Sequence, residues 1–149
     1  MVAGDHFTSW LILAIIASAS AACDLPKDPD NSWKEAHEIG LRVGVVPNPP
    51  FTMPKDSSWT GEEIELVQRF AADHSLRVVF HTGSESPLVR DLERNEIHLL
   101  VGGFRKDTEW TTLVAASRPF APENHVILIA PGENHLLMKL DEWLLKNTP

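Results

Sequence analysis

A short apolar segment that runs directly into two glycines constrains the fold more than any other feature of this sequence. The residues Leu99–Val101 are typical of a strand buried on both faces of a parallel sheet. Gly102 and Gly103 let the backbone turn sharply away from this strand, and the polar residues 105–110 follow at once. We therefore expect residues 105–110 to lie at the carboxyl end of a central strand, where open α/β sheets bind their ligands.

Strands and helices alternate along the rest of the chain. Aliphatic runs predict strands near residues 41–46, 76–80 and 125–130. Helix start signals stand at Thr60 with Glu63, a capping-box spacing, at Ser86 before Pro87, and at Asn134. Asp107 is placed to cap a further short helix that begins near Thr108. This order predicts an α/β fold, a three-layer αβα sandwich around a mostly parallel sheet of about four to five strands, with the first and third strands adjacent.

The first 22 residues have the character of a signal peptide. Their apolar run, Trp10–Ala22, is too short to span a bilayer and ends in small residues. It is followed by Cys23, the only cysteine, and the sequence Ser20–Cys23 resembles a bacterial lipobox, which implies lipidation of Cys23. An ordinary cleaved signal peptide beside an unrelated cysteine is the alternative. We expect residues 23–40 to form a tether and residues 41–149 to form the folded unit.

Composition excludes several partners. The chain is 43% hydrophobic, which suffices for a folded core, and its formal net charge is −8. An acidic chain without a basic block is a poor binder of nucleic acid or of anionic lipid surfaces. The histidines and the single cysteine lack metal-ligand spacing, so we expect no metal and no cofactor.

Four motifs in order carry a resemblance to a known family. They are LRVGVVPNPPF, TGEEIELVQRFA, LVRDLERNEIHLLVGGF and RKDTEWTTLVAASRPF. Together they resemble the bacterial extracellular solute-binding proteins of the polar amino-acid type, which have the type II periplasmic binding fold. The resemblance implies that residues 41–149 form one lobe of that fold, in a periplasmic or other extracytoplasmic location, working with a membrane transporter or permease component.

The resemblance also points to the candidate site residues. Amino-acid binders of this family hold the ligand carboxylate with an arginine whose place here is taken by Trp110, and Asp107 takes the place of a ligand-contacting threonine. A tryptophan stacks on flat or cationic groups but lacks the guanidinium fork. Arg105 offers an anion contact nearby, although Arg105 and Lys106 also suit a solvated loop. The candidate ligand or partner-binding residues are Phe51, Gly103, Arg105, Asp107 and Trp110.

The length of the chain leaves no room for the second lobe of that family. Two hypotheses follow. In the first, the chain is a membrane-anchored accessory or recognition subunit whose exposed edge meets a transporter, another membrane partner or a second copy in a homodimer. In the second, it is the conventional substrate-binding component of an ABC transporter and binds a small polar or amino-acid-like solute weakly or as a dimer.

An enzyme is a third hypothesis, which we disfavour. His81 with Ser84 and Glu85 forms a candidate acid-base cluster, but such loop residues are usually turn formers and solvated groups. No nucleophile elbow or HExxH motif is present in the sequence.

Overall fold

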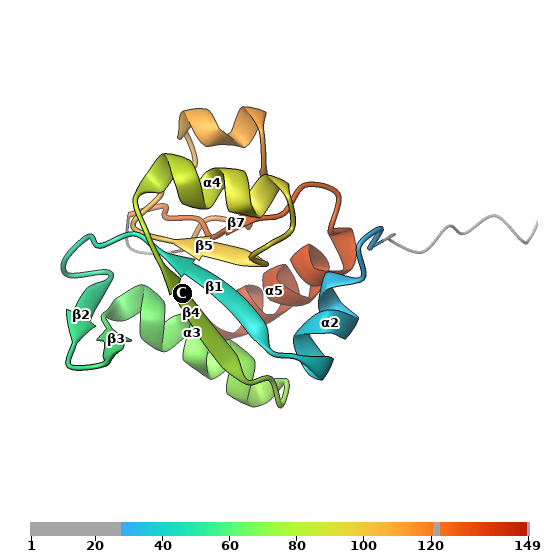
Figure 1. The fold of residues 1–149 in the computed structure, drawn as a ribbon, viewed down its shortest axis with the longest axis horizontal. Helices are drawn as coiled ribbons and strands as arrows, with labels where there is room; N and C mark the ends of the chain where they lie inside the picture. Colours follow the sequence, from blue (N-terminus) through green and yellow to red (C-terminus); the bar gives the residue numbers. More distant parts are fainter. Residues whose placement is uncertain (1–27, 121–122, 149) are drawn as a thin grey trace, which may run out of the picture.

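A five-stranded mixed sheet forms the centre of the molecule (Figure 1). The computed structural model describes residues 28–120 and 123–148. The strands stand in the order β4-β1-β5-β7-β6, and a separate hairpin joins β2 to β3. Their bounds are β1 Leu41–Val45, β2 Met53–Lys55, β3 Ser58–Thr60, β4 Val78–Thr82, β5 Leu99–Val101, β6 Ala115–Ala116 and β7 Leu128–Ile129.

The helices cover both faces of this sheet. Their bounds are α2 Ser32–Glu38, α3 Glu62–Asp73, α4 Glu85–Glu93 and α5 Asn134–Asn147, with a 3₁₀ helix, η2, at Glu109–Thr112. In Figure 1, α2, α3 and α5 lie on one side of the strands, and α4 and the 3₁₀ helix lie on the other. The three-layer α/β architecture expected from the sequence is confirmed.

Alternation along the strands divides the core into two layers. Val43 and Val45 of β1 pack with α2, α3 and α5. Leu100 of β5 points to the opposite layer, which it shares with Leu88 and Leu92 of α4. Both layers consist of closely packed apolar side chains, so they hold the sheet rigidly between the helices.

Strand pairing confirms the central topology. β1 lies between β4 and β5, and both pairs are parallel, so the first and third predicted strands are indeed adjacent. β7 is antiparallel to β5, and β6 is antiparallel to β7. The predicted strand at 125–130 is reduced to Leu128–Ile129, because His125 forms bridges to Arg105 and Phe120 in place of a continuous ladder.

Two of the predicted helix starts differ from those in the structure of α3 and α4. Thr60 belongs to β3 and makes no cap; Gly61 precedes α3 instead, and no side chain caps that helix. Ser86 is not a cap either, because α4 begins at Glu85. Pro87 therefore lies at the third helical position, where its missing N–H is still harmless.

The remaining two predicted caps are also wrong. Asn134 is the first residue of α5 and follows Glu133, which holds the capping position. Asp107 makes no cap, since Thr108 precedes the 3₁₀ helix. The cap predicted at Ser86 is displaced by two residues, to Ser84, and the other three by one, which a local pattern does not resolve.

Residues 28–40, predicted to belong to a tether, lie against the folded domain. They contain α2, whose Ser32 and Ala36 side chains are buried. The apolar side of this helix joins the core beside Phe70. The signal peptide, Cys23 and the first part of the tether lie outside the described residues.

Gly61 lies against the backbone of the loop after β1, with no room for a side chain. Its φ is 122° and its ψ is 168°, a region that only glycine occupies readily. A Cβ atom there would overlap the carbonyl oxygen of Phe51.

Gly61→Ala should therefore lower the free energy of unfolding by at least about 2 kcal/mol, measured by urea denaturation.

Gly132→Ala is the matched control for this substitution. Gly132 also has a positive φ, 84°, but a Cβ atom added there would stand 3.8 Å from its nearest neighbour. It should lose only the conformational cost of about 1 kcal/mol. Equal losses in the two variants would contradict the close approach of Gly61 to Phe51.

Candidate functional site

Two loops meet where β1 and β5 end. Val45 pairs with Val101, and the Val46 N–H donates to the Val101 carbonyl at 3.0 Å. The loop after β1 is closed on itself by Asn48, whose backbone N–H donates to the Thr52 hydroxyl at 2.9 Å. The Asn48 side-chain amide donates to the Gly102 carbonyl at 2.9 Å. The two loops are therefore held together by hydrogen bonds between the two chain segments.

Gly103 is the point of closest approach in this junction. Its φ is 72°, and a Cβ atom would overlap the Asn48 side-chain nitrogen and stand 3.1 Å from the Phe51 ring. The structure thus brings Phe51 and Gly103, two of the candidate residues, side by side. We call the surface formed by Phe51 and residues 102–107 the recognition edge.

A buried carboxylate supports the recognition edge from beneath. Glu63 of α3 is only 1% exposed, and its Oε2 accepts the backbone N–H groups of Gly102 at 2.9 Å and Gly103 at 3.0 Å. Its Oε1 lies 3.0 Å from His125 Nδ1. Since all these partners converge on one side chain, Glu63 sets the path that the chain takes on leaving β5.

Electrostatics at this carboxylate reflect two opposing causes. Burial raises the pKa of Glu63, while the hydrogen bonds from Gly103 and Gly102 and the neighbouring His125 act to lower it. The other ring nitrogen of His125 lies 3.3 Å from the exposed Glu123 carboxylate. The His125 ring meets Phe51 edge-to-face, with centroids 4.3 Å apart. Phe51 is thereby fixed on the same network.

Sequence reasoning missed Glu63 and His125 as parts of the site. Glu63 stands at a capping-box position, which predicts only a role at the helix start, toward the backbone and the helix dipole. Its real partners lie 39, 40 and 62 residues away in the chain. No local pattern contains that information. The signal that could have found it is the combination of an acid at the start of an apolar helix with a Gly-Gly turn later in the chain.

Arg105 and Asp107 lie together on the exposed part of the edge. Arg105 Nε is 3.6 Å from Asp107 Oδ1, and both side chains are mostly exposed. They line an open groove of about 550 Å³ with Lys106, Pro119 and Asn124. Because a surface ion pair of this kind contributes little to stability, both groups are free to exchange their partner for a ligand.

Trp110 is separated from this groove by its own contacts. It lies in the 3₁₀ helix and packs partly on the layer that contains Phe104 and Val114. Its indole N–H donates to the Glu85 carboxylate of α4. Glu85 is thereby engaged with Trp110, and among the described residues no hydrogen bond joins it to His81 or Ser84.

Within residues 28–120 and 123–148, no group of three or more His, Cys, Asp or Glu side chains is arranged to hold a metal ion. Nor does this part of the chain contain a helix long and apolar enough to cross a membrane.

The sheet order and the edge at the ends of β1 and β5 define a class of protein: one lobe of a periplasmic-binding-protein fold. Among solved structures, the arginine-bound form of domain 1 from TmArgBP, as a Phe57Trp mutant, matches with a TM-score of 0.67 and 19% identity over 78% of this chain and 95% of that one. An ancestral arginine-binding protein bound to arginine matches with a TM-score of 0.64 and 14% identity over 71% of this chain and 91% of that one. These likenesses show the fold.

The family follows from the sequence match. The model of the bacterial extracellular solute-binding proteins, family 3, matches residues 41–148, and the chain belongs to this family. A curated relative, the probable histidine-binding protein of Campylobacter jejuni subsp. jejuni serotype O:2 (strain ATCC 700819 / NCTC 11168), is 23% identical over 137 residues. The match covers 91% of this chain and 54% of the relative, so the chain spans about half the length of that protein. The family resemblance expected from the four motifs is confirmed.

Substitution of Glu63 tests the support of the recognition edge. Glu63→Ala leaves the buried Gly102 N–H, the partly buried Gly103 N–H and the His125 ring without their acceptor, so it should lower the free energy of unfolding by about 2–4 kcal/mol in urea denaturation.

Glu65→Ala is the matched control, because Glu65 is an exposed acid in the first turn of the same helix. Its loss should stay within about 0.5 kcal/mol. If the two variants lose the same stability, Glu63 acts only through the helix dipole and the edge does not depend on it.

Proposed function

We propose that this chain is an extracytoplasmic recognition subunit of a membrane transporter or other membrane partner, and that the recognition edge is the surface which meets that partner. The single observation that carries the proposal is the edge itself: Phe51 and Gly103 are held in place from beneath, while Arg105 and Asp107 lie exposed beside them. A rigid, exposed surface with paired charges suits contact with a protein.

The same geometry argues against tight capture of a free amino acid by this lobe alone. Small-molecule sites bury about 70–90% of the surface of their ligand. The groove beside Arg105 is open to solvent, and the position of the family's clamping arginine holds Trp110, whose N–H is bound to Glu85. The edge therefore has only Arg105 and Lys106 as cationic side chains for a carboxylate.

The proposal includes membrane attachment through Cys23. The segment Ser20–Cys23 resembles a lipobox, and a lone cysteine in an exported chain has no disulfide partner within that chain. A lipid on Cys23 would keep the recognition edge close to membrane partners. The family, which is extracellular, is consistent with this location.

Photo-crosslinking in native membranes tests this function. A photoreactive residue in place of Arg105 should crosslink the chain to a membrane protein. The matched control replaces Arg94, which is equally exposed, with 67% of its side chain accessible against 64% for Arg105, but lies at the end of α4 away from the edge.

Crosslinking from position 105 but not from position 94 is the expected result. Equal crosslinking from both positions, or none from position 105, would overturn the assignment of the edge.

The variant Cys23→Ser should move the protein from the membrane to the soluble fraction, and persistence in the membrane would contradict the lipid anchor.

A second function is favoured by a specific observation. A single domain of similar size, domain 1 of TmArgBP, has the same fold and is described in an arginine-bound form. One lobe of this fold is thus compatible with a bound amino acid. In this alternative the chain is a conventional substrate-binding component for an amino-acid-like solute, binding weakly or as a dimer whose second copy covers the groove.

Calorimetric titration of the full chain with L-arginine and with L-histidine separates the two functions. The recognition subunit should give dissociation constants weaker than about 100 μM, since the open groove leaves much of a ligand in water. One-to-one binding by the monomer with a dissociation constant near 1 μM, about −8 kcal/mol, would establish the alternative instead.

A further inference from the structure

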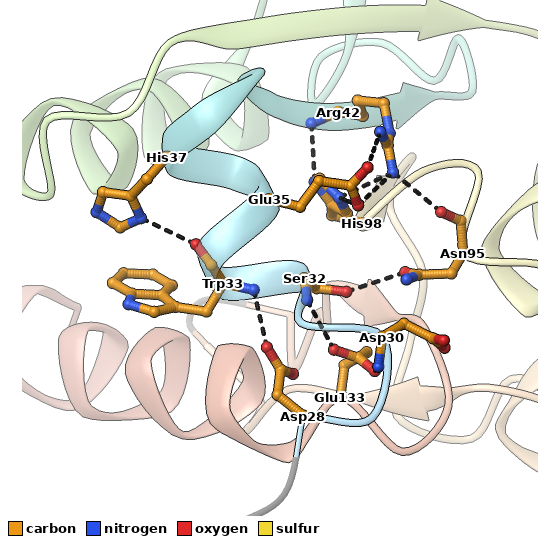
Figure 2. Close-up of polar contacts among 10 residues, drawn as sticks. All are labelled: Asp28, Asp30, Ser32, Trp33, Glu35, His37, Arg42, Asn95, His98 and Glu133. Carbon is orange, nitrogen blue, oxygen red and sulfur yellow. Dashed lines mark hydrogen bonds and ion pairs between the residues drawn. The ribbon is translucent and has the colours of Figure 1, made fainter.

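Residues 28–40 form a strap that crosses the end of the domain opposite the recognition edge. We call this segment the N-terminal strap. Its helix α2 buries Ser32 and Ala36, and its Trp33 ring lies 6.3 Å from the Phe70 ring of α3. Figure 2 shows that polar side chains fasten the strap at both of its ends.

The end of the strap next to β1 is fastened by opposite charges. Arg42 donates to both carboxylate oxygens of Glu35, at 2.8 and 2.9 Å, and His98 Nε2 lies 3.1 Å from the same carboxylate (Figure 2). The hydrogen bond from Arg42 holds the pKa of Glu35 below its usual value. Burial lowers the pKa of His98. This end is a charge-paired anchor that needs no proton from solvent near neutral pH.

The other end is fastened by two acids. Asp28 Oδ2 accepts the Trp33 N–H at 2.8 Å, and the two oxygens of Glu133 accept the N–H groups of Asp30 at 2.9 Å and Ser32 at 3.0 Å. Glu133 immediately precedes α5 and is only 1% exposed. The backbone N–H groups at the start of α2 are thus bound by two carboxylates, that of Asp28 just before the helix and that of Glu133 just before α5.

Within the described residues, one oxygen of this arrangement lacks a partner. Asp28 Oδ1 is buried and accepts no hydrogen bond from residues 28–120 and 123–148. A bare carboxylate oxygen buried beside a second carboxylate is costly, because it loses its hydration and meets a like charge. A proton on Asp28 removes both costs, since the resulting O–H group donates to Glu133.

We propose that Asp28 and Glu133 form a proton-operated latch, which fastens the N-terminal strap to α5 while the two acids share a proton and loosens it when that proton is lost. This inference does not depend on the proposed function.

The titration of the two acids agrees with the geometry. Burial, together with the hydrogen bond and the charge of Glu133, raises the pKa of Asp28 to about 6, although the backbone N–H groups of Trp33 and Leu136 act to lower it. Burial also opposes ionisation of Glu133, but hydrogen bonds from Asp28, Asp30 and Ser32 hold its pKa below the usual value. The shared proton therefore resides on Asp28, and Glu133 accepts.

The direction of the pH effect follows from these values. The pKa of Asp28 is 3.8 in an unperturbed chain and about 6 in the fold. The stability that the proton gives the strap is therefore fully present below the unperturbed value and is lost as the pH rises through about 6. Above that pH both acids are charged and repel each other.

Other ionisable groups surround the latch and add their own pH dependence. The Trp33 ring contacts the imidazoles of His37, His74 and His135. The charge of Glu133 acts to raise the pKa of His98. The exposed Asp30 and the exposed Lys34 belong to the strap itself. A comparison of variants at each pH cancels the contribution of all these groups. The groups that face the latch or the strap are Glu133, Asp30, Lys34, Glu35, Arg42, His37, His74, His98 and His135.

Opening the latch would release only the first part of the strap. The Glu35–Arg42 pair still holds the strap near neutral pH, so residues 28–34 are the segment set free. An extended chain spans up to about 3.3–3.6 Å per residue, so this segment could extend by on the order of 20 Å. An extracytoplasmic protein is exposed to the pH of its surroundings, so the release of this segment would respond to that pH.

Amide hydrogen exchange of the full chain at pH 4.5 and pH 7.5 tests the latch. Protection factors, which correct for the intrinsic effect of pH on exchange, are compared for α2 and, as a reference for the intact fold, for α3. In the wild-type chain, protection in α2 should fall by about tenfold relative to α3 at the higher pH; partial exposure of Asp28 limits the effect.

Asp28→Asn should abolish that fall, because its side-chain amide donates to Glu133 at every pH. Asp30→Asn, which removes a neighbouring exposed acid, is the matched control and should behave as the wild type. The latch is refuted if α2 protection in the wild-type chain is unchanged between the two pH values. It is equally refuted if Asp28→Asn shows the same fall while α3 stays protected.

Discussion

The carboxylate of Glu63 is the interaction on which the recognition edge depends. It accepts two consecutive backbone N–H groups where the chain leaves β5, and it pairs with His125, whose ring meets Phe51. A buried acid is tolerated only when it is fully hydrogen-bonded, and here each of its oxygens has a partner. One side chain therefore joins α3, the Gly-Gly turn and the loop after β1 into a single rigid unit.

This arrangement explains how a chain of about half the length of its curated relative still presents a defined surface. The support lies beneath the edge, within one lobe, and comes from residues of that lobe itself. The outward side carries Arg105 and Asp107, while Trp110 is drawn toward α4 by Glu85. The family and the fold are those of solute-binding proteins, and the open edge is what distinguishes the proposed role from that of a closed cleft.

Much of the fold could be predicted because its signals are local. The aliphatic run at Leu99–Val101 indicated β5, the start signal at Thr60 with Glu63 indicated a helix close to α3, and the alternation of strands and helices placed β1 beside β5. The site was accessible only in part: Phe51 and Gly103 were found through family motifs. Glu63 and Glu133 were not, because their partners lie far away in the chain and a capping position looks the same in sequence whether or not its side chain caps. The burial of α2 was not predicted either, because the residues that cover this helix also lie far away in the chain.

The central claim is that the edge is already built in the free chain. Nuclear magnetic resonance measurement of amide hydrogen exchange at Gly102 and Gly103, without any added solute or partner, tests it most directly. Both amides should be strongly protected, since each donates to the buried Glu63 carboxylate. Exchange of both amides at the rate of an unprotected peptide would contradict the account, because the edge would then form only when something binds to it.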